Sequence, residues 1–310
     1  LVMLAKNSGA DAVKFQTYSG DLLVNRKINP ERCRHFDKLS LSIDQFIDLY
    51  SLCEKLEIEF MTSVWDIDSL NKLDPYLKRH KIGSGDLTNY QILEKILSKD
   101  KPLIISTAMA TFNEIHELVN KINQIDNNFI ANQKLTLLHC VAMYGSPQYK
   151  YANLGFMDRL IKAFPEISIG YSDHVKGNLA VLTAIARGAK CIEVHFTDNK
   201  NQEFRDHHLS VLPHELKDIR SLSDVINDLF IDENPDIVND IEDPERIKEF
   251  RRAIYPSKDI RKDDLIRDDD LILLRPNIGL DARYLNKIIG ARAKRDIKKL
   301  EIISMEDFLY

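Results

Sequence analysis

Two lysines lie inside short apolar segments, where an unpaired charge is costly to bury. Lys14 lies in "DAVKFQ" and Lys81 in "HKIGSG". Hydroxyl side chains recur at the ends of similar segments, at Thr62, Ser84, Ser106 and Ser172. A lysine supplies a point charge and a hydroxyl donates a hydrogen bond, which together suit a phosphate and a carboxylate. The pattern favours an anionic substrate, and a solvated strand end is the alternative for Lys14.

Two histidines could hold a metal ion. His174 and His195 follow the neighbouring segments "ISIGYS" and "CIEV". Neutral imidazoles bind Mn, Fe, Co or Zn, and a metal with only two protein ligands could polarise a carbonyl oxygen. Two structural histidines bonded to backbone would fit the spacing equally well. His139 is a weaker candidate for a role in the site, and the surface or a helix is expected for His35, His80, His116 and His214.

A polar turn, "EFRDHHLS", follows the last of these segments and carries Asp206. A carboxylate within reach of the histidines could accept hydrogen bonds from sugar hydroxyls. An aspartate that caps its own turn is the alternative.

The elements that position these residues alternate between short apolar runs and longer amphipathic stretches. Seven runs read as buried strands, at 11–16, 58–63, 80–85, 102–107, 135–140, 167–172 and 191–196. Helical stretches occupy 44–56, 90–98, 112–122, 154–164 and 177–188, and a further helix is expected at 213–230. Thr111 with Glu114 forms a capping box, and Gly188 is a helix stop.

This alternation predicts an α/β fold with a parallel sheet and right-handed crossovers. We expect a TIM (β/α)8-type barrel, whose active-site face is formed by the carboxyl ends of the strands. Because Leu1 reads as the middle of a helix, the first strand is expected upstream of it. An open doubly wound sheet ranks lower, because polar residues recur at nearly every strand end. Residues two apart share a face, which pairs Lys14 with Gln16, Ser172 with His174, and Glu193 with His195.

The domain organisation follows from a change in composition. Residues 1–235 form the predicted barrel domain, and the acidic stretch 236–250 reads as a linker. Residues 251–310 contain short strand candidates separated by turns, which indicates a small β-rich domain.

Charge and cysteine content exclude several classes of protein. The net charge of −5 and a pI near 6.0 give no general attraction to nucleic acid or to an anionic membrane. No apolar stretch has the length of a membrane span. The four cysteines are widely separated, which argues against a disulfide framework and favours a cytoplasmic protein.

The motifs together resemble the sialic acid (N-acetylneuraminate) synthase family. The resemblance runs in order from Gly9 to about Glu215 and is carried by "GADAVKFQTY", "KIGSGDLTNYQILEKI", "PLIISTAMAT", "LLHCVAMYGSP", "IGYSDHVKGN" and "IEVHFT". The segments "RRAIYPSKDIRKDDL", "LLRPNIGL" and "GARAKRDI" resemble the family's antifreeze-like (SAF) domain.

The resemblance implies an enzyme that condenses phosphoenolpyruvate with an N-acetylmannosamine-type aldehyde and water. It implies a domain-swapped homodimer and a Mn²⁺ or Mg²⁺ ion on His174 and His195. The implied phosphoenolpyruvate contacts are Lys14, Thr62, Lys81, Ser84, Ser106 and Ser172. The implied sugar contacts are Gln16, Asp86, Tyr144, Asp206 and, from the small domain of the partner subunit, Arg275. Catalysis is expected to depend on Lys14, Lys81, Asp86, His174 and His195.

The chain departs from the family pattern at several positions. Ala142 stands where a polar residue often helps to hold phosphoenolpyruvate, and Ala108 where glycine is usual. Gly145 follows Tyr144 where proline is more common, and Asp86 stands where some members carry glutamate. The family's first strand, with an acidic residue and an Asn-His pair, lies outside this sequence.

Alternatives remain at this point. A synthase for legionaminic, pseudaminic or spore-coat sugar acids would carry the same motifs. A sugar-phosphate synthase would lack the antifreeze-like domain. A non-catalytic sugar-binding barrel is the alternative outside the enzymes.

Overall fold

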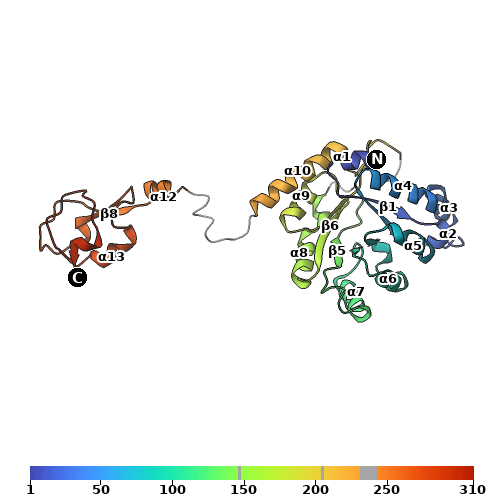
Figure 1. The fold of residues 1–310 in the computed structure, drawn as a ribbon, viewed down its shortest axis with the longest axis horizontal. Helices are drawn as coiled ribbons and strands as arrows, with labels where there is room; N and C mark the ends of the chain where they lie inside the picture. The colour runs from blue at the N-terminus through green and yellow to red at the C-terminus, as the bar shows by residue number, and fades with distance from the viewer. Residues whose placement is uncertain (146–147, 204–205, 231–242) are drawn as a thin grey trace. The chain divides into compact units, whose positions relative to one another are not determined.

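The computed structural model describes residues 1–145, 148–203, 206–230 and 243–310. The chain divides into two compact units, Leu1–Phe230 and Ile231–Tyr310 (Figure 1). Each unit is described by itself.

The first unit is built on one sheet of seven parallel strands that are neighbours in sequence order. The strands are β1 (Ala12–Thr17), β2 (Glu59–Val64), β3 (His80–Ile82), β4 (Leu103–Ser106), β5 (Leu135–His139), β6 (Ser168–Asp173) and β7 (Ile192–Val194). All seven predicted strands are therefore confirmed. The strand order never reverses, as it would in a doubly wound sheet, so that alternative is wrong.

The sheet curls until its two edge strands approach each other. Nζ of Lys14 on β1 lies 3.7 Å from Oε2 of Glu193 on β7. The described residues form no further strand between these two edges. The curled sheet is of the TIM-barrel type, as predicted, and its curvature brings the strand ends around one cavity.

Helices cover the outer face of the curled sheet (Figure 1). They are α1 (Val2–Asn7), α4 (Ile43–Lys55), α5 (Ile67–Leu73), α6 (Tyr90–Leu97), α7 (Phe112–Ile125), α8 (Leu154–Ala163), α9 (Leu179–Ala186) and α10 (Pro213–Leu229). The predicted capping box of α7 is present, because Thr111 Oγ1 accepts from the Glu114 N–H and the Glu114 carboxylate accepts from the Thr111 N–H. Gly188, with φ of +94°, ends α9 as expected.

The strands alternate between an outer and an inner face. On β4, Leu103 and Ile105 join the main apolar core under the helices, whereas Ile104 faces inward with Met61 and Leu138. The same alternation carries Ser106 to the inside at the strand end. Apolar residues thus fill the inside of the curled sheet nearer the amino ends of the strands, and polar residues line it at the carboxyl ends.

A helical insertion that the sequence analysis did not predict follows β1. It contains α2 (Gly20–Leu23) and α3 (Pro30–Leu39). Asn29 caps α3 by accepting from the Arg32 N–H, and Pro30 occupies the first helical turn. The mean hydropathy of α3 is low, which explains why an apolar periodicity did not reveal it.

The second unit is small and has its own apolar core. It contains α12 (Pro244–Phe250), β8 (Ala253–Pro256), β9 (Leu271–Leu274), α13 (Leu285–Ile288), β10 (Arg292–Ala293) and β11 (Phe308–Leu309). β8 pairs with β9 and β10 with β11, both antiparallel. The linker predicted at 236–250 lies partly outside the described residues, and its last part is α12. Among the described helices, none has the length and apolar character needed to cross a membrane.

Candidate active site

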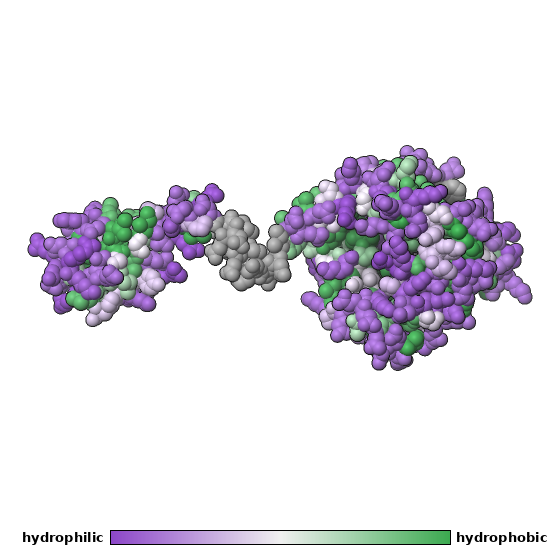
Figure 2. All heavy atoms as spheres, viewed as in Figure 1, coloured by the Kyte–Doolittle hydropathy of each residue, from purple (hydrophilic) through white to green (hydrophobic). Residues whose placement is uncertain are grey.

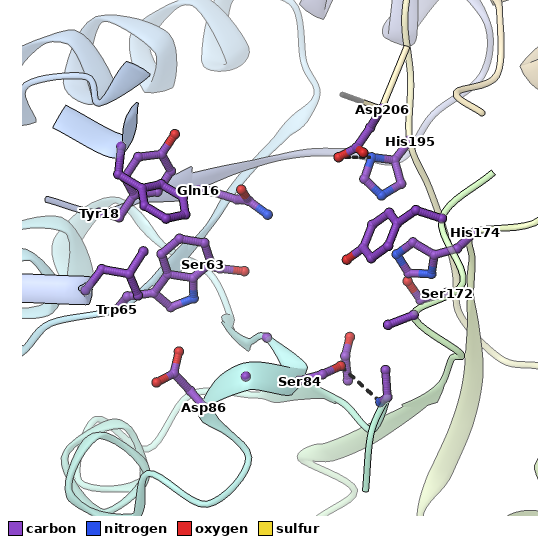
Figure 3. Close-up of a pocket in the computed structure, with 18 of the residues that line it drawn as sticks. Gln16, Tyr18, Ser63, Trp65, Ser84, Asp86, Ser172, His174, His195 and Asp206 are labelled. Carbon is purple, nitrogen blue, oxygen red and sulfur yellow. Dashed lines mark hydrogen bonds and ion pairs between the residues drawn. The ribbon is translucent and has the colours of Figure 1, made fainter. Parts of the chain in front are cut away.

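A cavity of about 1380 Å³ lies at the carboxyl ends of the strands (Figure 3). It is lined by most of the predicted site residues, namely Lys14, Gln16, Lys81, Ser84, Asp86, Ser106, Tyr144, Ser172, His174, His195 and Asp206. Residues distant in the sequence therefore meet in one space. Two predicted residues, Thr62 and Arg275, are not among the lining residues.

Thr62 lies on the other face of its strand. On β2, Ser63 lines the cavity, and Thr62 is buried with its hydroxyl 2.8 Å from the Thr17 hydroxyl. Adjacent strand residues point to opposite faces, so both cannot reach the cavity. The structure therefore corrects the expected position of Thr62 and places Ser63 on the cavity side of β2.

Arg275 lies in the second unit, directly after β9. Its guanidinium lies 5.2 Å from the centre of the Phe250 ring, and the side chain is exposed. The expected contact with a sugar stays a prediction.

A carboxylate joins the two lysines of the cavity. Oε2 of Glu193 lies 3.7 Å from Nζ of Lys14 and 3.5 Å from Nζ of Lys81. Ser172 Oγ donates to Glu193 Oε1 at 3.1 Å, and Lys81 Nζ donates to Ser106 Oγ at 2.6 Å. Five strands, β1, β3, β4, β6 and β7, thus supply one connected polar network.

The charges in this network depend on each other. Burial alone would raise the pKa of Glu193, but Lys14 and Lys81 lower it to about 2. Burial lowers the pKa of Lys81, and the Glu193 carboxylate opposes this effect. The Glu193 carboxylate therefore favours the charged form of the buried Lys81 ammonium group. The strand period pairs Glu193 with His195 on one face but predicts no role for Glu193; only the curl of the sheet brings it to the lysines.

The two predicted metal-binding histidines are adjacent. The ring centroids of His174 and His195 are 5.2 Å apart, and the Tyr144 ring lies 4.6 Å from His174. Burial, with a smaller contribution from His195, lowers the pKa of His174 to about 4. Burial also lowers the pKa of His195, whereas Asp206, with Oδ2 at 3.9 Å from His195 Nδ1, acts in the opposite direction.

The backbone around His174 is fixed by a buried carboxylate. Asp173 Oδ1 accepts from the Tyr171 hydroxyl at 2.7 Å and from the Val175 N–H at 3.1 Å. His174 Nδ1 is buried and has no hydrogen-bond partner among the described residues. A neutral imidazole with an unused nitrogen suits a divalent metal. In the described part of the chain, no cluster of three or more ligating side chains is present, so the described residues offer such a metal the two histidines.

Two other histidines are structural. His139 is buried, and its Nε2 lies 2.9 Å from the Ala152 carbonyl oxygen, which agrees with its weaker candidacy. His80 was expected on the surface or a helix, but it is buried on β3 with Nε2 3.1 Å from Asp74 Oδ1. The alternation of β3 explains the difference, since Lys81 faces the cavity and His80 therefore faces the helices.

Comparison with known proteins follows the same division. Residues 1–229 match the NeuB family and residues 251–309 match the SAF domain. The chain belongs to the NeuB family of sugar-acid synthases. It is 36% identical to the N,N'-diacetyllegionaminic acid synthase of Legionella pneumophila, over 96% of this chain and 86% of that protein.

Other relatives make different products. The pseudaminic acid synthase of Helicobacter pylori is 29% identical over 97% of this chain and 90% of that protein. The crystal structure of the N-acetylneuraminic acid (sialic acid) synthetase of Leptospira borgpetersenii is 27% identical, with a TM-score of 0.69, over 75% of this chain and 79% of that chain. Family membership therefore leaves the sugar open.

One departure from the pattern of the NeuB family has a structural explanation. Gly145 has a φ of +72°, and a Cβ atom there would collide with the ring of His208, so glycine suits both the backbone and the packing. Nothing in the structure explains alanine rather than glycine at position 108, since Ala108 contacts Ser84 Oγ through its backbone N–H, at 3.0 Å. Ala142 lines the cavity and supplies no polar side chain there. Parts of two predicted motifs, at 146–147 and 204–205, lie outside the described residues.

Proposed function

We propose that this chain condenses phosphoenolpyruvate with the open-chain aldehyde of an N-acylated amino sugar and water, which yields a sialic acid-type sugar acid and phosphate. One observation carries the proposal: Lys14 and Lys81, with hydroxyl groups beside them, share a cavity with the neutral pair His174 and His195. A reaction between an anion and an aldehyde needs positive charge to bind the anion, which the lysines supply. It also needs a group that polarises the aldehyde, which a metal ion on the histidines could supply.

The lysine region binds phosphoenolpyruvate. Lys14 and Lys81 supply positive charge, and the hydroxyls of Ser84, Ser106 and Ser172 donate hydrogen bonds to its phosphate and carboxylate. Glu193 holds both lysines in place before the substrate arrives. Because the donors are already oriented, little reorganisation is needed during the reaction.

The histidine region receives the sugar. His174 and His195 would hold a Mn²⁺ or Mg²⁺ ion, which when bound acts as a Lewis acid toward the aldehyde oxygen. Gln16, Tyr144 and Asp206 line the same cavity and would hold the sugar hydroxyls; Figure 3 shows Gln16 and Asp206 there. Their task is to orient the aldehyde carbon toward the methylene carbon of phosphoenolpyruvate.

The bonds change as follows. The methylene carbon of phosphoenolpyruvate forms a bond to the aldehyde carbon, and the aldehyde oxygen gains a proton. Positive charge develops on the phosphate-bearing carbon, to which water adds. The bond from that carbon to the phosphate oxygen then breaks, which leaves a ketone and free phosphate. Lys14 and Lys81 stabilise the negative charge of the departing phosphate throughout.

The second unit would complete the site in a domain-swapped homodimer, in which Arg275 of one subunit contacts the sugar in the other. The support is the exposed guanidinium of Arg275, which forms no ion pair with any described carboxylate. Ultracentrifugation gives the oligomeric state. A mixture of Arg275→Ala and His174→Ala chains should regain part of the activity that each lacks, since one mixed site is intact; no recovery would contradict the exchange.

Activity measurements test the proposal directly. Purified protein is incubated with phosphoenolpyruvate and each of several N-acylated amino sugars, with and without Mn²⁺, and phosphate release and product mass are measured. Phosphate release only with sugar and metal, with a product of the summed composition, is expected. Phosphoenolpyruvate binding without phosphate release for any sugar would favour a non-catalytic barrel. Full metal-dependent turnover by His174→Ala would contradict the ligand assignment.

A further inference from the structure

One part of the cavity is not used by the proposed chemistry. It is lined by three aromatic side chains, Tyr18, Phe36 and Trp65, which we name the aromatic wing. Figure 3 shows Tyr18 and Trp65 across the cavity from His174 and His195. The volume of about 1380 Å³ exceeds the roughly 300–1,000 Å³ of ordinary small-molecule pockets. The wing therefore offers room beyond the reacting carbons.

The rings of the wing pack on each other. The Tyr18 and Trp65 rings are stacked with centroids 5.2 Å apart at 20°, and Phe36 meets Tyr18 edge-on at 5.1 Å. The backbone N–H of Trp65 donates to the Thr17 carbonyl at 3.3 Å, which ties the residue after β2 to the end of β1. Tyr18 and Trp65, which follow the neighbouring strands β1 and β2, present a flat apolar wall to the cavity.

The α2–α3 insertion holds Phe36 against this wall. The Gly20 N–H donates to Asp37 Oδ1 at 2.8 Å, and a Cβ atom on Gly20 would collide with that carboxylate and with the Cys33 carbonyl. Arg26 donates to Asp37 Oδ2 at 3.0 Å, and Cys33 is the buried residue of α3. The wing is therefore a built surface of the fold.

Two polar groups border the apolar wall. A Cβ atom on Gly83 would lie 3.6 Å from the indole nitrogen of Trp65, so this N–H lies over the turn that carries Asp86. Figure 3 shows the nitrogen-bearing edge of Trp65 on the cavity side. Within the described chain the indole N–H has no acceptor, and Asp86 accepts only from Asn89 Nδ2 at 3.2 Å. Burial raises the pKa of the half-buried Asp86.

A donor, an acceptor and a flat apolar wall match the three parts of an N-acyl group. Its carbonyl accepts from an indole N–H, its N–H donates to a carboxylate, and its methyl group packs on aromatic rings. A phosphate would suit the wing less, because Asp86 would repel it. The nearby Arg32 lies over Phe36 at 5.7 Å and is a single exposed cation.

We infer that the aromatic wing is the specificity subsite for an N-acyl group carried by the sugar at a carbon remote from the aldehyde. The substrate would then be an amino sugar with a second acylated nitrogen. This inference rests on the proposed function, because it assumes that the aldehyde lies at the histidines and the sugar chain extends toward Tyr18 and Trp65.

The test compares two sugars that differ at one remote position, one with a second acetamido group and one with a hydroxyl. The wild-type kcat/KM should be higher for the diacetamido sugar. In Trp65→Phe the wall is kept and the donor is lost, so the ratio of the two kcat/KM values should fall about tenfold, as expected for one hydrogen bond to a substrate group. Trp65→Leu, which loses both, should lower the ratio further.

Controls separate the possible failures. No phosphate release by the wild type with either sugar would contradict the proposed function. Wild-type turnover with an equal ratio in Trp65→Phe, Trp65→Leu and the wild type would overturn the subsite alone. A preference for a 6-phosphorylated sugar that depends on Arg32 would overturn it in favour of an anion site. If Trp65→Leu fails to fold, as judged by circular dichroism, Trp65→Phe and Tyr18→Leu carry the comparison.

Discussion

The two ends of the cavity are built in different ways. The lysine end, formed by Lys14 and Lys81, consists of side chains on the strands themselves, and the Glu193 carboxylate forms an ion pair with both lysines. The aromatic wing comes from residues just beyond β1 and β2 and from the α2–α3 insertion, and its rings hold one another by packing. The strands thus carry the groups that the proposed reaction would use for every sugar, whereas the residues that follow them carry the groups that would distinguish sugars. Substitutions at the two ends should therefore have different consequences.

The largest effect is expected at the lysine end. Lys81→Ala removes a preorganised positive charge from the substrate anion and leaves Glu193 with one lysine fewer. We expect kcat/KM to fall about 10²–10³-fold, as for loss of a key electrostatic contact, measured by phosphate release. The matched control is Lys78→Ala, an exposed lysine three residues away, which should keep wild-type activity. A loss below tenfold in Lys81→Ala would contradict the comparison.

The stability of the barrel should depend on pH through His80, which lies beside Lys81 in sequence but faces away from the cavity. Burial lowers the pKa of His80 to about 4, so between pH 6.5 and 4 the unfolded chain binds more protons than the folded one. The contribution of neutral His80 to the free energy of unfolding is therefore fully present above pH 6.5. As the pH falls from 6.5 to 4, the free energy of unfolding should decrease by about 3 kcal/mol through this group. Denaturant unfolding at several pH values measures it.

A non-titrating variant isolates this effect. His80→Gln can keep a hydrogen bond to Asp74 but cannot gain a proton. The free energy of unfolding should then fall less steeply toward pH 4 than in the wild type. Equal slopes in the two proteins would show that His80 does not contribute.

A moderate effect is expected for Glu193→Gln. The two ammonium groups lose their carboxylate, so the protein without substrate should be destabilised by about 1–2 kcal/mol, a value reduced because Glu193 is partly exposed. Phosphoenolpyruvate should then raise the melting temperature more than it does in the wild type, since it supplies the missing negative charge. An unchanged melting temperature without substrate would refute the bridging role.

The smallest effect on activity is expected from Gly20→Ala, in the support of the aromatic wing. The added Cβ atom displaces Asp37 and the Cys33 backbone, and therefore shifts α3 and Phe36. The KM for the sugar should rise about threefold, since overpacking of this kind costs about 1 kcal/mol or more in total. The KM for phosphoenolpyruvate should change less. A larger rise in the KM for phosphoenolpyruvate than in the KM for the sugar would contradict the functional separation of the two ends of the cavity.

Much of the architecture was predictable because it depends on local patterns. Apolar runs such as 102–107 and 135–140 formed the strands, and the capping box at Thr111 marked a helix start. The cluster of polar residues in the cavity was predictable because parallel strands all end on one side of the sheet, so polar residues at those carboxyl ends lie close together. The α2–α3 insertion was not predictable in this way, because the mean hydropathy of α3 is low and the position of the insertion depends on close contact at Gly20.

The sequence by itself determined the order of the strands, their polar ends and the pairing of residues two apart, because these follow from the period of a strand. Only the tertiary structure decided that Glu193 reaches Lys14, since that contact depends on how far the sheet curls. It also decided that Ser63 rather than Thr62 faces the cavity, and that Tyr18, Phe36 and Trp65 form one wall. These outcomes depend on distances between elements far apart in the chain, which no local pattern contains.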